Sequence, residues 1–191
     1  MYRLSCASPS SLDDASVLSD IQSHPNLIIL RSMTKLFAIP GLRLGYLVAH
    51  RDVVECLKRY KEPWTVNCIA QIAGERLLDE DDYVEESRKF VQGERQFLFA
   101  QLSQIDWLIP FPSGANFLLV RIDDDFMTAA TLQERLIRKG MLIRDSSNFV
   151  GLDERFFRVA VKKRAENQKL ISALSEITEF DGVLCRKLEV S

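Results

Sequence analysis

Short apolar runs alternate with longer amphipathic stretches along most of the chain, and few fold classes accommodate that alternation. Strands are expected over six segments: residues 27–30, 44–49, 107–109, 116–122, 141–143 and 156–161. Helices are expected between them, over residues 53–60, 66–78, 83–102, 128–139 and 165–177, with a loop at 31–41. The run at 27–30 is wholly apolar, which is typical of a strand buried on both faces. Strands that alternate with helices predict an α/β fold.

The composition suits a globular protein and argues against some classes of partner. Lys plus Arg total 25 and Asp plus Glu total 27, a balance that gives no reason to expect nucleic acid or an anionic membrane. No apolar run reaches the length of a membrane span. The four cysteines form no C-x-x-C pair and the two histidines lie far from a second ligand, so no metal site is expected. Scattered thiols suit a reducing cytoplasm.

One segment between two expected strands carries residues suited to covalent chemistry. A hydroxyl, Ser32, lies three residues before Lys35, and a guanidinium, Arg43, lies eight residues after it. A lysine that holds pyridoxal 5'-phosphate (PLP) as a Schiff base needs partial desolvation, and a hydroxyl with a guanidinium fork binds the cofactor phosphate well. We therefore predict Lys35 as the Schiff-base lysine and Ser32 and Arg43 as phosphate ligands. The alternative is a solvated surface lysine, because isolated S-x-x-K matches are common.

The full string around Lys35 resembles the S-x-[ST]-K and G-x-R-x-G pattern of fold-type I PLP-dependent aminotransferases (class I/II), and the likeness extends over roughly residues 26–180. Within that family the loop with Pro40 resembles the threonine-phosphate decarboxylase group of cobalamin biosynthesis. The strings E-P-W-T-V-N at 62–67 and G-L-D-E-R-F-F-R-V-A-V at 151–161 favour the same group. The turn P-S-G-A-N-F at 112–117 is shared with histidinol-phosphate aminotransferases, which are the alternative within this fold.

The resemblance implies PLP as the cofactor and decarboxylation of O-phospho-L-threonine, a phosphorylated amino acid, to (R)-1-amino-2-propanol phosphate. It also implies a homodimer for the full-length parent, and the scattered thiols give the expectation of a cytoplasmic location. Arg144 and Arg158 are implied as ligands of the substrate anions, with Asn116 as a weaker contact. The alternatives are a surface position at the strand end for Arg158, an Arg144–Asp145 surface pair, and a turn cap for Asn116.

Two further residues of the resemblance have open roles. Both Trp64 and Asn67 are candidates to line the site. Trp64 is equally suited to a place in the core.

The resemblance also implies groups that the chain does not match. Family members carry a glycine-rich phosphate cradle, a stacking aromatic and a D-E-A-[YF] aspartate upstream of the lysine, and the aspartate keeps the ring nitrogen protonated. Residues 1–7 read M-Y-R-L-S-C-A, with no such motif. We therefore expect an N-terminally truncated chain whose remaining sheet exposes apolar edges. Its expected parts are a leader of uncertain structure at 1–25, the C-terminal part of the PLP-binding large domain at 26–85, and the small α/β C-terminal domain at 86–191. The alternative from another class is a non-catalytic remnant, or a module that folds beside another subunit.

Overall fold

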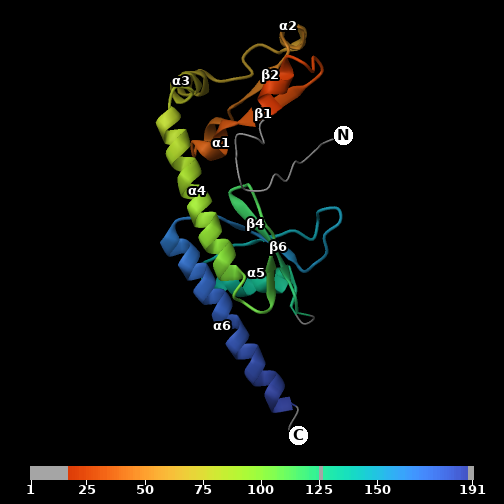
Figure 1. The fold of residues 1–191 in the computed structure, drawn as a ribbon, viewed down its shortest axis with the longest axis vertical. Coiled ribbons are helices and arrows are strands. Elements are labelled where there is room, and N and C mark those ends of the chain that lie inside the picture. Colours follow the sequence, from red (N-terminus) through yellow and green to blue (C-terminus); the bar gives the residue numbers. More distant parts are fainter. Residues whose placement is uncertain (1–16, 125–126, 189–191) are drawn as a thin grey trace. The chain divides into compact units, whose positions relative to one another are not determined.

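A computed structural model of the chain describes residues 17–124 and 127–188, with side chains as far as Ile177. The chain divides into two compact units, Met1–Arg88 and Lys89–Ser191 (Figure 1). Most of the leader expected at residues 1–25 lies outside the described residues, which begin at Val17. None of the described helices combines the length and the hydropathy that a membrane span requires.

The first unit is built on an antiparallel hairpin, in which Ile28 lies opposite Ala49 and Ser32 lies opposite Gly45. Its strands are β1 (Ile28–Ser32) and β2 (Gly45–Ala49). Its other elements are η1 (Val17–Ile21), α1 (Met33–Leu36), η2 (Pro40–Leu42), α2 (Arg51–Tyr60), α3 (Cys68–Leu77) and the start of α4 (Asp81–Leu102). The two expected strands and the helices of this unit are therefore present.

The segment expected as a loop, residues 31–41, instead contains the end of β1, the one-turn helix α1 and the start of η2. In α1 the amide of Phe37 donates to the carbonyl of Met33, at 3.2 Å. In η2 the amide of Leu42 donates to the carbonyl of Ile39, also at 3.2 Å. Helices of three or four residues are too short to show a 3.6-residue apolar period, so the sequence pattern could not reveal them.

Strand β1 is largely exposed, so the expectation of a strand buried on both faces is wrong for the described chain. Leu30 is 78% exposed and Ile28 is 46% exposed. Within the described residues β1 has β2 as its neighbour in a two-stranded sheet. A lone hairpin buries little apolar surface, and this explains why the apolar run does not become core.

The second unit is built on a four-stranded antiparallel sheet in the order β3-β4-β6-β5. Its strands are β3 (Leu108–Pro110), β4 (Phe117–Ile122), β5 (Arg144–Asp145) and β6 (Phe156–Ala160). Its helices are the rest of α4, α5 (Ala129–Arg138) and α6 (Arg164–Leu188).

The strand expected at 141–143 is misplaced, because β5 begins only at Arg144. Residues 139–141 end helix α5: Gly140 has a φ of +74°, and the amide of Met141 donates to the carbonyl of Leu136 at 2.9 Å. A glycine in the left-handed region followed by this backward hydrogen bond is a common helix C-terminus. The apolar residues after Gly140 therefore complete the helix end, although Ile143 is still buried.

One face of the four-stranded sheet carries the core of the second unit. Burial alternates along β4, with Leu118, Val120 and Ile122 fully buried. These side chains cluster with buried residues of the three helices: Leu98 and Leu102 of α4, Ala129, Leu132 and Leu136 of α5, and Ala173, Leu174 and Ile177 of α6. Because side chains alternate across a strand, Phe117 of β4 and Arg158 of β6 are assigned to the other face.

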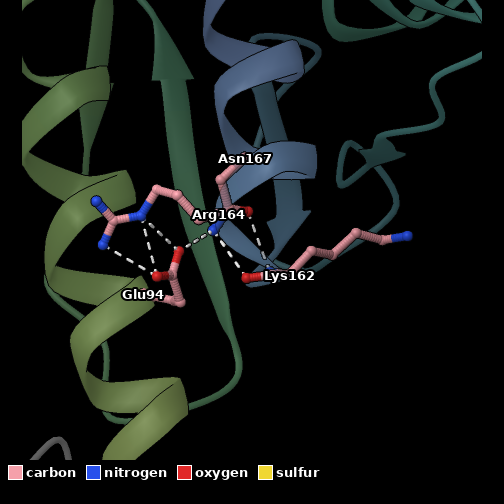
Figure 2. A network of polar contacts seen from close by, with 4 residues as sticks. All are labelled: Glu94, Lys162, Arg164 and Asn167. Atoms are coloured by element: carbon pink, nitrogen blue, oxygen red, sulfur yellow. Dashed lines mark hydrogen bonds and ion pairs between the residues drawn. The ribbon is translucent and has the colours of Figure 1, made fainter.

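A buried carboxylate joins helix α4 to the start of α6 (Figure 2). Glu94 is 8% exposed and accepts hydrogen bonds from Arg164 Nε at 3.0 Å and from Asn167 Nδ2 at 2.9 Å. Asn167 also accepts from the amide of Lys162 at 3.1 Å and donates to its carbonyl at 2.8 Å. The Arg164 guanidinium lies over the ring of Phe97, 3.7 Å from its centroid. The network ties the first turn of α6 to helix α4 and to Lys162, which follows β6 in the chain.

Candidate functional site

The pairing of β1 with β2 brings the predicted cofactor ligands of the first unit to one end of the hairpin. Ser32 is the last residue of β1 and lies opposite Gly45. The amide of Met33 then donates to the carbonyl of Leu44, at 3.2 Å. Arg43 therefore lies just before β2, beside the point where β1 ends at Ser32, and Lys35 lies in the short helix α1 between them in the chain.

Side-chain contacts hold this lysine loop, residues 32–44, in place. The ring of Phe37 stacks on that of Tyr83, with 5.6 Å between centroids, and the Tyr83 hydroxyl donates to the carbonyl of Leu36 at 3.1 Å. Ser32 Oγ and Thr34 Oγ1 are hydrogen-bonded at 2.8 Å, and Thr34 is buried. The loop is thus anchored on both sides of Lys35.

Left-handed backbone conformations also occur in this loop. Ala38 has a φ of 51° and Arg43 a φ of 53°. An L-residue other than glycine in this region costs about 1–2 kcal/mol, and such strain is concentrated at functional sites in many proteins. Gly45 meets a different restriction: a Cβ there would lie 2.7 Å from the carbonyl oxygen of Arg31. The glycine of the G-x-R-x-G pattern therefore permits the tight pairing of the hairpin.

The donors on the loop fit a phosphorylated aldehyde. Lys35 and Arg43 are both exposed, and within the described residues neither side chain has a carboxylate partner. Among the described residues, Arg43 Nη1 donates to the carbonyl of Pro40 alone, at 3.3 Å. One amine, two hydroxyls and one guanidinium on a single loop match the groups that PLP presents. The partial desolvation expected for Lys35 is not provided by the described residues.

The second unit brings the two predicted substrate arginines together. Arg144 of β5 lies directly opposite Arg158 of β6, which in turn lies opposite Leu119 of β4. Like charges directly opposite in a sheet are destabilising. Neither arginine forms an ion pair within the part of the chain that the structure describes. An unbalanced pair of guanidiniums is suited to receiving an anion from solution.

Two aromatic rings surround these guanidiniums. The Arg158 guanidinium carbon lies 4.7 Å from the ring centroid of Phe117 and 5.0 Å from that of Phe149. The Arg144 guanidinium carbon lies 5.6 Å from the same Phe149 ring. Sequence reasoning included Phe117 only as part of a shared turn and missed Phe149. A single aromatic in a loop has no periodic signal in the sequence. The contact of Phe149 with the arginines becomes visible only when the strands are paired.

Two alternatives for these residues are wrong. Asp145 does not pair with Arg144: its Oδ1 accepts from the amide of Ser147, at 2.8 Å. Asn116 does not cap its turn, because the turn is held by Ser113 Oγ, which accepts from the amide of Ala115 at 3.0 Å. Asn116 is exposed and comes directly before Phe117 of β4. Its carbonyl accepts from the amide of Val161, at 2.9 Å, which leaves its side-chain amide available.

The open roles of Trp64 and Asn67 are resolved only in part. Trp64 is 97% exposed, so it is not a core residue of the described chain. Asn67 is the N-cap of α3, where its Oδ1 accepts from the amide of Ala70 at 2.8 Å. This is a common role for asparagine at a helix start.

Comparison with known proteins identifies the class to which this chain belongs. The model of the family Aminotransferase class I and II matches residues 5–174. The chain belongs to this family, and its fold is that of fold-type I PLP-dependent enzymes.

The curated relatives include threonine-phosphate decarboxylases and histidinol-phosphate aminotransferases. The threonine-phosphate decarboxylase of Salmonella typhimurium is 37% identical over 158 residues, which are 82% of this chain and 43% of the relative. A protein of Caldanaerobacter subterraneus subsp. tengcongensis, named provisionally for the same activity, is 41% identical over 89% of this chain and 46% of its own length. The chain thus spans about half the length of the curated relatives that it matches.

Solved structures include both groups of the resemblance. The histidinol-phosphate aminotransferase of Clostridium acetobutylicum matches with a TM-score of 0.80 and 32% identity, over 86% of this chain and 49% of that one. The L-threonine-O-3-phosphate decarboxylase of Porphyromonas gingivalis matches with a TM-score of 0.76 and 35% identity, over 85% and 50%. The histidinol-phosphate aminotransferase of Sinorhizobium meliloti, solved with PLP, matches with a TM-score of 0.73 and 25% identity, over 84% and 43%.

Proposed function

We propose that this chain carries the lysine-bearing part of a PLP-dependent enzyme that decarboxylates O-phospho-L-threonine. The observation that carries the proposal is the pairing of Arg144 with Arg158. Two neighbouring guanidiniums with no carboxylate partner among the described residues suit a substrate that bears two anionic groups. Similarity to the Salmonella threonine-phosphate decarboxylase and to the Porphyromonas decarboxylase structure supports decarboxylation over other reactions of the family.

In this proposal the lysine loop holds the cofactor. Lys35 would bond it covalently through Nζ, and Ser32 Oγ and Arg43 would donate hydrogen bonds to its phosphate. Thr34 is hydrogen-bonded to Ser32 and would orient that hydroxyl. The bound cofactor supplies an electron-accepting ring for the electron pair that is released when a bond at the substrate α-carbon breaks.

The arginines hold the substrate. Planar guanidinium forks bind phosphate and carboxylate through paired hydrogen bonds, so Arg144 and Arg158 would bind these two groups of the phosphorylated amino acid. Asn116 offers an amide next to Phe117 and would add a weaker polar contact. The substrate amine would replace the Lys35 amine on the cofactor, and the freed Lys35 Nζ would then deliver a proton to the α-carbon after the carboxylate has left as carbon dioxide. The product is then (R)-1-amino-2-propanol phosphate.

The same proposal includes the setting of the reaction. We place the enzyme in the cytoplasm, supported by the exposed free thiols Cys56 and Cys68. From the family resemblance we propose a homodimer for the whole protein. The expected domains, with a cofactor-binding part at 26–85 and a small domain at 86–191, belong to the proposal too.

A second candidate is transamination of histidinol phosphate, which is favoured by the match to the Clostridium structure. The experiment uses a longer protein that contains this chain, with PLP added. Release of carbon dioxide from O-phospho-L-threonine would support the decarboxylase. Amino transfer from histidinol phosphate to 2-oxoglutarate, without release of carbon dioxide, would show that the second candidate is right.

The role of Lys35 has its own test. The PLP-treated chain is reduced with borohydride and mapped by peptide mass analysis. The label is expected on Lys35, absent from a Lys35→Arg variant and unaffected in a Lys61→Arg control, which changes another exposed lysine of the same unit. A label on any other lysine would refute the assignment.

A further inference from the structure

We propose that Phe149 is a positioning residue for the arginine pair: its ring holds both guanidiniums so that they can receive the two anionic groups of one phosphorylated ligand. The choice of ligand rests on the proposed function, whereas the positioning itself rests on the contacts of the second unit. Phe149 belongs to no helix or strand and is not part of any motif that identified the site.

The contacts are specific to this ring. Phe149 lies 5.0 Å from the guanidinium carbon of Arg158 and 5.6 Å from that of Arg144, measured to the ring centroid. Of these two arginines, Phe117 contacts Arg158, at 4.7 Å. Phe149 is thus the aromatic that the two arginines share, and Arg158 has a ring from each of two different segments beside it.

The loop that carries Phe149 is fixed by its own backbone. The amide of Phe149 donates to the carbonyl of Ser146 at 3.1 Å, and the carbonyl of Phe149 accepts from the amide of Leu152 at 3.1 Å. Ser146 is fully buried, and its amide donates to the carbonyl of Phe156 in β6 at 2.9 Å. Gly151 has a φ of +89°, a conformation that glycine adopts without strain. The ring is therefore presented from a pinned turn.

The physical need for such a ring comes from the strand register. Arg144 and Arg158 are cross-strand neighbours, so their charges repel each other. The face of an aromatic ring has a negative quadrupole that attracts guanidinium groups. A ring shared by both arginines offsets part of the repulsion and restricts the directions in which the two side chains can point. An aliphatic side chain of similar size fills the space but offers no such attraction.

The experiment compares four forms of the 191-residue chain: wild type, Phe149→Leu, Phe149→Tyr and Phe111→Leu. Phe111 is the matched control because it is 37% exposed, against 41% for Phe149, and its ring stacks on Phe156 with no arginine of the described chain over it. Two properties are measured, with the melting temperature as a check of folding. The first is the position of the arginine Nε–H and Cζ resonances, which the ring current of Phe149 shifts. The second is affinity for O-phospho-L-threonine and for inorganic phosphate.

We expect Phe149→Leu to move the resonances of Arg144 and Arg158 and to weaken binding of the probes about five- to thirtyfold, as two cation–π contacts at exposed sites would. Phe149→Tyr should keep both properties, and Phe111→Leu should leave them unchanged. The proposal is overturned if Phe149→Leu leaves the arginine resonances in place, or if it binds inorganic phosphate as tightly as the wild type. Failure of the wild type to bind O-phospho-L-threonine would refute the proposed substrate, while the resonances would still decide the role of Phe149.

Discussion

Arg43 combines a charge that suits a phosphate with a backbone conformation that suits glycine. Its φ of 53° lies in the left-handed region, and its guanidinium is exposed with one hydrogen bond to a backbone carbonyl. A glycine at this position would be free of the strain, but it would carry no charge. The side chain and the backbone preference at this position can therefore be separated by mutation.

We expect Arg43→Gly to leave the free energy of unfolding unchanged or to raise it by up to about 1 kcal/mol, because the left-handed strain is relieved. PLP affinity should fall at least about tenfold, since charge-assisted hydrogen bonds are worth ~1.5–3 kcal/mol. Chemical denaturation and a PLP titration measure the two effects. Arg43→Asn, which tolerates the left-handed region without a charge, should match the glycine variant. Undiminished PLP affinity in both variants would exclude Arg43 as a phosphate ligand.

At the scale of residues, the sequence predicts functional groups that lie close together in the chain better than it predicts contacts between distant segments. Ser32, Lys35 and Arg43 lie within one short string, so their residue types and spacing indicate the chemistry directly. The contact of Phe149 with both arginines depends on strand pairing and on a loop turn, and neither has a signature in residue type or spacing. The exposure of Lys35 was not predictable either, because it depends on which other elements cover the loop.

The two-residue strand β5 places Arg144 directly opposite Arg158, and the repulsion between these like charges destabilises the strand pair. We expect Arg144→Thr to raise the free energy of unfolding by ~0.2–1 kcal/mol, because the repulsion disappears and threonine favours strands. Binding of O-phospho-L-threonine should be lost in the same variant.

The control for Arg144→Thr is Arg31→Thr, which changes an exposed strand arginine that lies opposite Tyr46. It removes a charge without relieving an arginine–arginine pair, so no stabilisation of this kind is expected. Denaturation curves of the three proteins, recorded at low salt, give the comparison. A destabilised Arg144→Thr variant would mean that the two guanidiniums do not repel each other appreciably.

The contact between α4 and α6 predicts an acid-dependent stability. The hydrogen bond from Arg164, assisted by that from Asn167, lowers the pKa of Glu94 from its ordinary value of 4.5, although burial opposes the shift. A carboxyl whose pKa is lower in the folded state stabilises the fold above its unfolded pKa, and this stabilisation disappears as the pH falls through the folded pKa.

Glu94→Gln should therefore be less stable than the wild type at neutral pH, and the difference should shrink as the pH falls below about 4.5. Thermal melting between neutral and acidic pH measures it, with Glu134→Gln, on the exposed side of α5, as the control. A difference in melting temperature between Glu94→Gln and the wild type that stays constant with pH would show that the charge of Glu94 does not stabilise the contact between the helices.

At the scale of elements, the long helices and the longer strands of both units were predictable from apolar periodicity. The misses have local causes. The strand expected at 141–143 fails because Gly140 and Met141 complete the end of α5, and only then does β5 begin. Helix α1 was hidden inside an expected loop because one turn is too short for a period. The direction of pairing in both sheets also needed the structure, since periodicity carries no information on it.

At the scale of the whole molecule, the 191 residues contain no D-E-A-[YF] motif, in which the family resemblance implies an aspartate for the cofactor ring nitrogen. We expect the chain, expressed alone with PLP, to show little or no release of carbon dioxide from O-phospho-L-threonine. Catalysis needs a protonated and fixed ring as well as bound substrate. The Lys35→Ala variant measures the background release of carbon dioxide. Turnover that depends on Lys35 and equals that of the Salmonella relative would show that other residues of this chain replace the aspartate.

The paired arginines also couple folding to the salts in solution. An anion that binds only the folded form adds stability by mass action, about 2.7 kcal/mol when its concentration is a hundred times its Kd. Arg144 and Arg158 have no carboxylate counterions among the described residues. We therefore expect an anion from the buffer to act as their counterion. Phosphate and sulfate would then act as folding cofactors for the second unit, and chloride would do so only weakly. A preparation that is stable in phosphate and marginal in chloride would trace this sensitivity to two side chains on neighbouring strands.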